Sequence, residues 1–253
     1  MIRPVALTLG MLVVTGSCMA CSRVPIAAAP GETGRRPRSL PLAELRVPAD
    51  RPGRAFAVVL TGDGPTGGRA RRLAQELRRG GTPAVVWHSL RYYWRPRTPD
   101  EAARDLDGVI RHYAREWGRD RVVLVGYSMG ADVLPFLVNR LPADTRARVA
   151  GLALAGMAAD AVFEFRLEQW WGPSTAPRHP VLPELRRLMG GVPVTCLWGA
   201  GDRLAACTRL EGTPVRVVEL RGGHHFKGDF GRLAAEVRAV AARAEAEGVP
   251  GPP

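Results

Sequence analysis

Ser128 is the residue of this 253-residue chain best placed to act as a nucleophile. It stands in Gly126-Tyr127-Ser128-Met129-Gly130, a Gly-x-Ser-x-Gly pattern. The apolar, β-branched run 122–125 before it predicts a strand, and 133–140 predicts a helix. A tight turn between a buried strand and a helix lifts the serine hydroxyl clear of the sheet, and a Cβ at either glycine would collide there. The stretch therefore predicts a nucleophile elbow.

A serine nucleophile needs a base, and the base needs an acid that orients it. Asp202 follows the apolar run 192–198, and His224 and His225 follow the run 215–220. Serine, aspartate and histidine in this order are typical of α/β-hydrolase triads. We take His225 as the base, because small residues followed by His-Phe are the commoner form of this loop, with His224 as the alternative. Turn capping or surface hydrogen bonding is the competing interpretation of these side chains.

The oxyanion of a serine-catalysed reaction needs backbone N–H donors. We expect one from Met129 and one from the glycine-rich loop 61–64, at Gly62 or Asp63. The same glycines would also permit an ordinary tight turn. A metal site at the two histidines is weakly supported, because Asp229 is the one carboxylate close to them in sequence. No metal or other cofactor is expected.

The order of the predicted elements, together with the order of the candidate triad residues, indicates an α/β-hydrolase fold. Apolar runs alternate with predicted helices, which implies a mostly parallel sheet of about six strands with helices on both faces. In such sheets polar groups that follow the strands gather at one edge, where ligands bind. The clearest helix start is 98–101, where Thr98, Pro99 and Glu101 form a capping box. The expected strands are 56–60, 83–87, 122–125, 149–155, 192–198 and 215–220.

The chain divides into four segments by composition. Arg3, the apolar run 4–14 and the small residues 16–21 predict a signal peptide over 1–21. A lipoprotein signal is the alternative, with Cys18 or Cys21 as the lipidated residue. Residues 22–54 are rich in Pro, Ala and Arg and predict a linker with one short strand near 45–47. Residues 55–247 form the hydrolase domain, and 248–253 a disordered tail.

The chain is strongly basic, with a formal net charge of +12, yet it contains a single lysine, Lys227. The arginines are scattered over predicted helix faces and are not interleaved with aromatic residues. A solvated basic surface is the first interpretation, and attraction to anionic lipid the second. No nucleic-acid partner is expected.

Two of the four cysteines, Cys196 and Cys207, lie in the predicted domain. In an exported protein they can form a disulfide that brackets Asp202. The alternative is a pair of unbonded, buried thiols.

Beyond these patterns, the sequence from Phe56 to the C-terminal helix resembles the bacterial virulence proteins of the VirJ/AcvB family, which have the α/β-hydrolase fold. The first loop departs from that family, because Pro65 and Thr66 replace its usual Gly-Trp. The matching segments are Thr61-Gly62-Asp63-Gly64, Ser89-Leu90-Arg91-Tyr92-Tyr93-Trp94 with Arg97-Thr98-Pro99, Gly126 to Pro142, Phe163-Glu164-Phe165 with Trp170-Trp171-Gly172, and Gly222-Gly223-His224-His225-Phe226.

The resemblance implies an exported, periplasmic enzyme that hydrolyses aminoacylated phosphatidylglycerol, chiefly lysyl-phosphatidylglycerol, at an anionic membrane surface. It also implies two alternatives: a non-catalytic accessory protein that binds secretion-system components, or a general carboxylesterase or thioesterase. A lysyl headgroup carries two amines, so acidic residues should line its pocket. We expect Asp63, Asp132, Asp160 and Glu164 in that role, and Tyr92, Trp94, Trp170 and Trp171 as an apolar lip or as packing.

Overall fold

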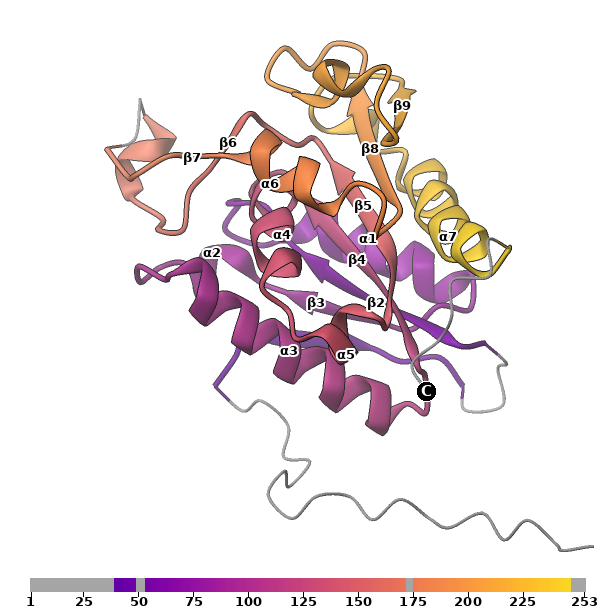
Figure 1. Cartoon of the computed structure of the whole chain (residues 1–253). Coiled ribbons are helices and arrows are strands. Elements are labelled where there is room, and N and C mark those ends of the chain that lie inside the picture. The colour runs from indigo at the N-terminus through magenta and orange to yellow at the C-terminus, as the bar shows by residue number, and fades with distance from the viewer. Residues whose placement is uncertain (1–38, 49–52, 172–174, 247–253) are drawn as a thin grey trace, which may run out of the picture. The chain divides into compact units, whose positions relative to one another are not determined.

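A seven-stranded sheet organises the part of the chain that the computed structural model describes, residues 39–48, 53–171 and 175–246 (Figure 1). All of its strands run parallel except β1, which pairs antiparallel with β3 at one edge. The order across the sheet is β1 (Leu42–Leu45), β3 (Ala84–Trp87), β2 (Ala55–Leu60), β4 (Arg121–Tyr127), β5 (Val149–Ala155), β8 (Val194–Gly199) and β9 (Arg216–Leu220).

The six parallel strands are those that the apolar runs predicted, and the α/β-hydrolase fold is confirmed. Strand β1 is the difference. It comes from the segment expected to be a linker, a few residues before the short strand anticipated near 45–47. The short strand expected within the linker is therefore present but lies nearer the N-terminus, because β3 offers an open edge with which Leu42–Leu45 pairs. The predicted signal peptide and the tail lie outside the described residues.

Helices cover both faces of the sheet, because successive strand residues point to opposite sides. Val58 and Leu60 belong to one core cluster and Ala57 and Val59 to the other. The first cluster includes residues of α3 (Pro99–Glu116), α4 (Met129–Asn139) and α6 (Val181–Leu188); the second includes residues of α1 (Gly68–Arg79) and α7 (Phe230–Ala246). Helices α1 and α4 thus lie on opposite faces.

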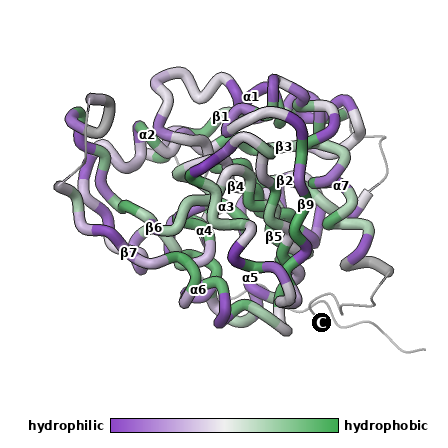
Figure 2. The backbone as a smooth tube through the Cα atoms, turned by 90° about the horizontal axis from the view of Figure 1, so that it is seen from above, coloured by the Kyte–Doolittle hydropathy of each residue, from purple (hydrophilic) through white to green (hydrophobic). Residues whose placement is uncertain are grey.

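The central strands are buried along their whole length. Every residue of β4 and β5 is buried, and Figure 2 shows hydrophobic colour along these strands. Burial on both faces explains why they are continuous apolar runs instead of alternating ones.

Helix α3 begins as its sequence predicted. The Thr98 hydroxyl accepts a hydrogen bond from the Glu101 N–H at 3.2 Å, and the Glu101 carboxylate accepts one from the Thr98 N–H at 2.8 Å. This reciprocal capping box satisfies two of the N–H groups that a helix start leaves unpaired.

The remaining short elements join the main ones. They are α2 (Ser89–Tyr92), α5 (Ala143–Arg146), the strand pair β6 (Asp160–Ala161) and β7 (His179–Pro180), and the 3₁₀ turns Leu167–Trp170, Cys207–Leu210 and Phe226–Gly228. Across the described ranges, none of the helices is both long and apolar enough to cross a bilayer.

Candidate active site

Ser128 lies in the turn between β4 and α4, with φ 53° and ψ −124°. Its N–H donates to the Ala155 carbonyl at 2.8 Å, which ties the turn to the neighbouring strand. A Cβ on Gly126 would lie 2.4 Å from Ala131 Cα, and one on Gly130 would lie 2.4 Å from the Leu60 carbonyl oxygen. The glycines therefore allow the close approach that gives Ser128 the left-handed φ of a nucleophile elbow.

His224, and not His225, stands between the serine and the acid. Its Nε2 is 2.9 Å from Ser128 Oγ, and its Nδ1 is 2.7 Å from Asp202 Oδ2. The expectation that His225 is the base is wrong, because the exposed His225 side chain, one residue further along the turn, points elsewhere: its Nδ1 lies 3.4 Å from the Tyr127 hydroxyl.

Two crossing loops bring the acid and the base together. The Gly201 N–H donates to the Gly222 carbonyl at 2.8 Å. A Cβ on Gly199 would lie 2.3 Å from the Gly223 carbonyl oxygen, so only glycine permits this crossing. Asp202 is 7% exposed, and its second carboxylate oxygen accepts the Leu204 N–H at 3.1 Å. The acid is thus held on both oxygens before any substrate arrives.

Tyr127 contacts both histidines through its hydroxyl group. Its hydroxyl donates to the His224 carbonyl at 3.2 Å. Burial raises the pKa of Tyr127 to about 12, so it stays a neutral donor. Burial and the nearby Arg69 charge lower the pKa of His225. His225 is therefore predominantly neutral at pH 7.

The two expected oxyanion donors lie beside the serine. Met129 is the first residue of α4, and the first N–H groups of a helix have no partner within it. A Cβ on Gly62 would lie 3.1 Å from Ser128 Cβ, so this backbone abuts the nucleophile. The Thr61 hydroxyl donates to the Gly62 carbonyl and accepts the Ser89 N–H, each at 3.0 Å, which fixes the loop that also carries Asp63.

Ser128 opens into a cavity of about 400 Å³. Its lining includes His224, His225 and Asp63, and on α1 it includes Arg69 and Arg72. The sequence analysis missed the two arginines and treated them only as part of a scattered basic surface. Their position shortly after the loop 61–64 was the available signal. A second cavity, about 340 Å³, lies at the N-terminal ends of β8 and β9, whereas Ser128 follows the C-terminal end of β4.

Two of the other expected acidic residues, Asp63 and Asp160, act electrostatically on Asp132. Asp132, on α4, accepts the Ala158 N–H at 2.7 Å. Burial raises its pKa well above the usual range, and the charges of Asp63 and Asp160 raise it further. Glu164 instead forms an ion pair with Arg166 at 3.0 Å, so it is not brought into this group.

The expected role of Tyr92 in substrate binding is wrong. Its side chain is 3% exposed, and its hydroxyl donates to Asp105 at 2.6 Å. It packs edge-on against Trp87 and Tyr93, so it belongs to the core. Trp94 and Trp171 are 55% and 78% exposed, whereas the side chain of Trp170 lies outside the described part of the structure.

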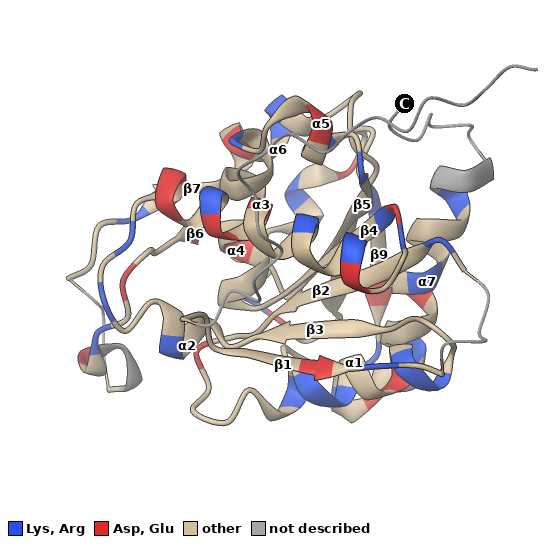
Figure 3. Cartoon of the chain, turned by 90° about the horizontal axis from the view of Figure 1, so that it is seen from below, with Lys and Arg blue, Asp and Glu red and all other residues tan. Residues whose placement is uncertain are grey.

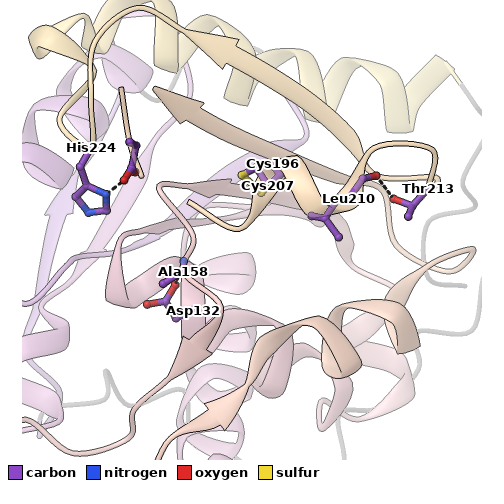
Figure 4. The surroundings of a disulfide bond; sticks show 8 residues. Asp132, Ala158, Cys196, Cys207, Leu210, Thr213 and His224 are labelled. Carbon is purple, nitrogen blue, oxygen red and sulfur yellow. Dashed lines mark hydrogen bonds and ion pairs between the residues drawn. A yellow bond between two sulfur atoms is a disulfide. The ribbon is translucent and has the colours of Figure 1, made fainter. Parts of the chain in front are cut away.

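A disulfide joins Cys196 on β8 to Cys207 in the following 3₁₀ turn (Figure 4). The bond closes a loop that contains Asp202, with a Cα–Cα distance of 5.6 Å. It anchors the acid loop to the sheet. Within the described ranges, no three His, Cys, Asp or Glu side chains are grouped to hold a metal ion.

Gly156 is a further site residue that the sequence did not reveal. It follows β5 with φ +66°, and a Cβ there would lie 2.9 Å from His224 Cε1. The glycine keeps open the space that the imidazole occupies.

Comparison with known proteins agrees with this architecture. The sequence model of the bacterial virulence protein (VirJ) family matches residues 54–244. No curated protein matches the chain.

Solved structures with a similar fold share little sequence with the chain. Est1E from Butyrivibrio proteoclasticus with bound ferulic acid is 9% identical, with TM-score 0.55 over 81% of this chain and 96% of that one. The esterase domain of a Rhodothermus marinus protein is 14% identical, with TM-score 0.53 over 81% and 91%. The monoacylglycerol lipase of Paleococcus ferrophilus is 15% identical, with TM-score 0.50 over 82% and 99%. At these identities the likeness shows the fold alone.

Proposed function

The chain belongs to the bacterial virulence protein (VirJ) family, and on that basis we propose that it is a serine hydrolase that cleaves the aminoacyl ester of lysyl-phosphatidylglycerol. The observation that carries the proposal is the unbroken line of contacts from Ser128 through His224 to Asp202, at 2.9 and 2.7 Å. These distances lie within hydrogen-bond reach, as a nucleophile, its base and an orienting acid require.

The first half of the reaction forms an aminoacyl-serine. Asp202 faces His224 Nδ1, so that nitrogen carries the proton and Nε2 is free to accept the proton of Ser128. Oγ attacks the ester carbonyl carbon as His224 accepts the serine proton. The tetrahedral intermediate then expels the glycerol oxygen, which receives that proton from His224. Phosphatidylglycerol leaves and the amino acid stays on the serine.

The second half repeats these steps with water. His224 removes a proton from the water molecule, the hydroxide attacks the aminoacyl-serine, and Ser128 leaves with that proton. The N–H of Met129 and an N–H of the Gly62–Asp63 backbone stabilise the oxyanion in both halves. One such donor typically contributes about 2.7–4 kcal/mol to transition-state stabilisation.

The acidic side chains near α4 support a cationic aminoacyl group. Burial and repulsion from the charges of Asp63 and Asp160 raise the pKa of Asp132, so this carboxyl group holds a proton that a nearby cation would displace. A lysyl ammonium would relieve that repulsion. A neutral acyl group would not, and this favours an aminoacyl ester over a simple one.

The proposed location of the enzyme rests on its N-terminal sequence. We propose that the signal peptide 1–21 directs export to the periplasm, with Cys18 or Cys21 as candidate lipid anchors. The basic surface would then face a membrane rich in anionic lipid. Retention of activity in the cytoplasmic fraction of cells that produce the full chain would contradict this placement.

The decisive test is release of lysine from lysyl-phosphatidylglycerol by the wild type and by three alanine variants. We expect Ser128→Ala and His224→Ala to lose at least about 10⁴-fold in kcat, because both remove a member of the triad. His225→Ala changes the adjacent residue, which does not contact Ser128 or Asp202, and should retain a far higher kcat. Equal losses in the two histidine variants would contradict the assignment of the base.

The same assay separates the competing functions. A general carboxylesterase would turn over short acyl esters faster than the lysyl lipid. A non-catalytic accessory protein would release no lysine, and its biological effect would survive Ser128→Ala with the fold intact.

A further inference from the structure

The cavity at Ser128 has a basic wall that the proposed chemistry does not use. Arg69 and Arg72 line it from the start of α1, and His225 lines it from the loop after β9. Figure 3 shows basic residues on successive turns of α1. Neither Arg69 nor Arg72 forms an ion pair with any residue that the structure describes. Two cations with no counter-ion among the described residues therefore line the cavity beside the nucleophile.

Charged side chains near Ser128 come from helices on both faces of the sheet. Arg69 and Arg72 are on α1, which covers one face, whereas Asp132 is on α4, which covers the other. Asp63 also lines the cavity, and its charge acts on Asp132. The charge of Arg69 acts on a different pair, Tyr127 and His225. Ser128 lies at the end of β4, and Asp132, which does not line the cavity, follows it on α4.

A substrate with one cationic and one anionic end matches this separation. In lysyl-phosphatidylglycerol the ammonium groups lie on the acyl side of the scissile ester, and one glycerol unit separates that ester from the phosphodiester. In an orientation that places the amines near Asp132, the glycerol leaving group would extend toward α1.

We propose that Arg69, Arg72 and His225 form a subsite for the phosphodiester of the substrate headgroup. This deepens the proposed function and rests on it. Guanidinium groups bind phosphate oxygens through charge-assisted, often paired hydrogen bonds. The neutral His225 adds a ring N–H as a further donor. The subsite makes the enzyme select esters that carry a phosphate on the alcohol side, and it fixes the orientation of the ester over Ser128.

Binding without turnover gives the first test. Glycerophosphoglycerol, the headgroup diester without acyl chains or lysine, is titrated calorimetrically into Ser128→Ala protein. We expect Arg69→Gln or Arg72→Gln in that background to weaken binding about tenfold each. Arg71→Gln is the control, because Arg71 carries the same charge on the same helix but does not line the cavity. No detectable binding, or equal weakening by all three variants, would overturn the subsite.

Kinetics on two soluble substrates give the second test. One is lysyl-phosphatidylglycerol without its two fatty acyl chains, which keeps the lysyl ester and the phosphodiester. The other is lysylglycerol, which lacks the phosphate. We expect the wild type to prefer the phosphodiester in kcat/KM, and Arg69→Gln and Arg72→Gln to reduce that preference about tenfold, mainly through KM. Arg71→Gln should leave it unchanged. A preference that survives both substitutions would overturn the inference.

The two tests separate the inference from the proposed function. Ser128-dependent hydrolysis of both lysyl esters with no phosphate preference would leave the hydrolase standing and remove the subsite. Binding of glycerophosphoglycerol that depends on Arg69, with no hydrolysis of either ester, would keep the anion site and remove the lysyl-ester hydrolase.

Discussion

Removing the disulfide tests how the acid loop is held. The variant Cys196→Ala/Cys207→Ala deletes a cross-link between residues 11 positions apart, both fully buried. In the chain-entropy model a closed loop of about this length stabilises the folded state by ~3 kcal/mol, because it restricts the unfolded chain. For a domain of this size each kcal/mol corresponds to roughly 2–4 °C in Tm, so we expect the Tm to fall by about 6–12 °C.

The assay is thermal unfolding followed by circular dichroism, with and without reductant. Reductant should lower the Tm of the wild type to near that of the double variant and leave the variant unchanged. Ester hydrolysis below the transition should also fall in the variant, because Asp202 lies within the released loop. The reasoning is refuted if the variant melts within about 2 °C of the oxidised wild type, or if reductant destabilises the variant equally.

Three further predictions follow from single positions. Gly156→Ala should lower the free energy of unfolding by about 1–2 kcal/mol, because its backbone is left-handed, and should also reduce kcat by displacing His224. The control Gly190→Ala, with φ +87° and nothing within 4 Å of an added Cβ, should lose stability but keep its kcat. Equal activity in the two variants would contradict the predicted contact between the Gly156→Ala methyl group and His224. Asp132 has a raised pKa in the folded state, so the wild type loses stability as the pH rises through that pKa. The stability of Asp132→Asn, measured by urea unfolding, should therefore increase relative to that of the wild type between pH 4 and pH 8. Parallel pH profiles of stability for the two proteins would contradict this. Thr98→Ala should reduce the free energy of unfolding by about 1 kcal/mol, and Thr98→Ser, which keeps the cap, should restore most of it.

Local sequence patterns determined the elements and the nucleophile. Continuous apolar runs identified the parallel strands, because strands buried on both faces need apolar residues at every position. The turn at Ser128 could be predicted from the sequence, because a Cβ at either flanking glycine would clash with the backbone in any such strand–turn–helix. The capping box at Thr98 was readable for the same reason, since its partners are three residues apart.

Tertiary structure decided the assignments that local patterns left open. His224 and His225 are chemically identical neighbours, and the crossing of two glycine-rich loops selects which ring reaches Ser128. An aromatic residue such as Tyr92 could lie at the rim of the site or in the core, and its packing against Trp87 places it in the core.

The basic wall at Ser128 shows the same division. The sequence by itself determined that α1 is rich in arginine and that it follows the loop near the nucleophile. Only the packing of α1 against its face of the sheet decided that Arg69 and Arg72 line the cavity while Arg71, between them, does not. Side-chain direction along a helix depends on which stripe the core buries, and that stripe is set by contacts with strands distant in the sequence.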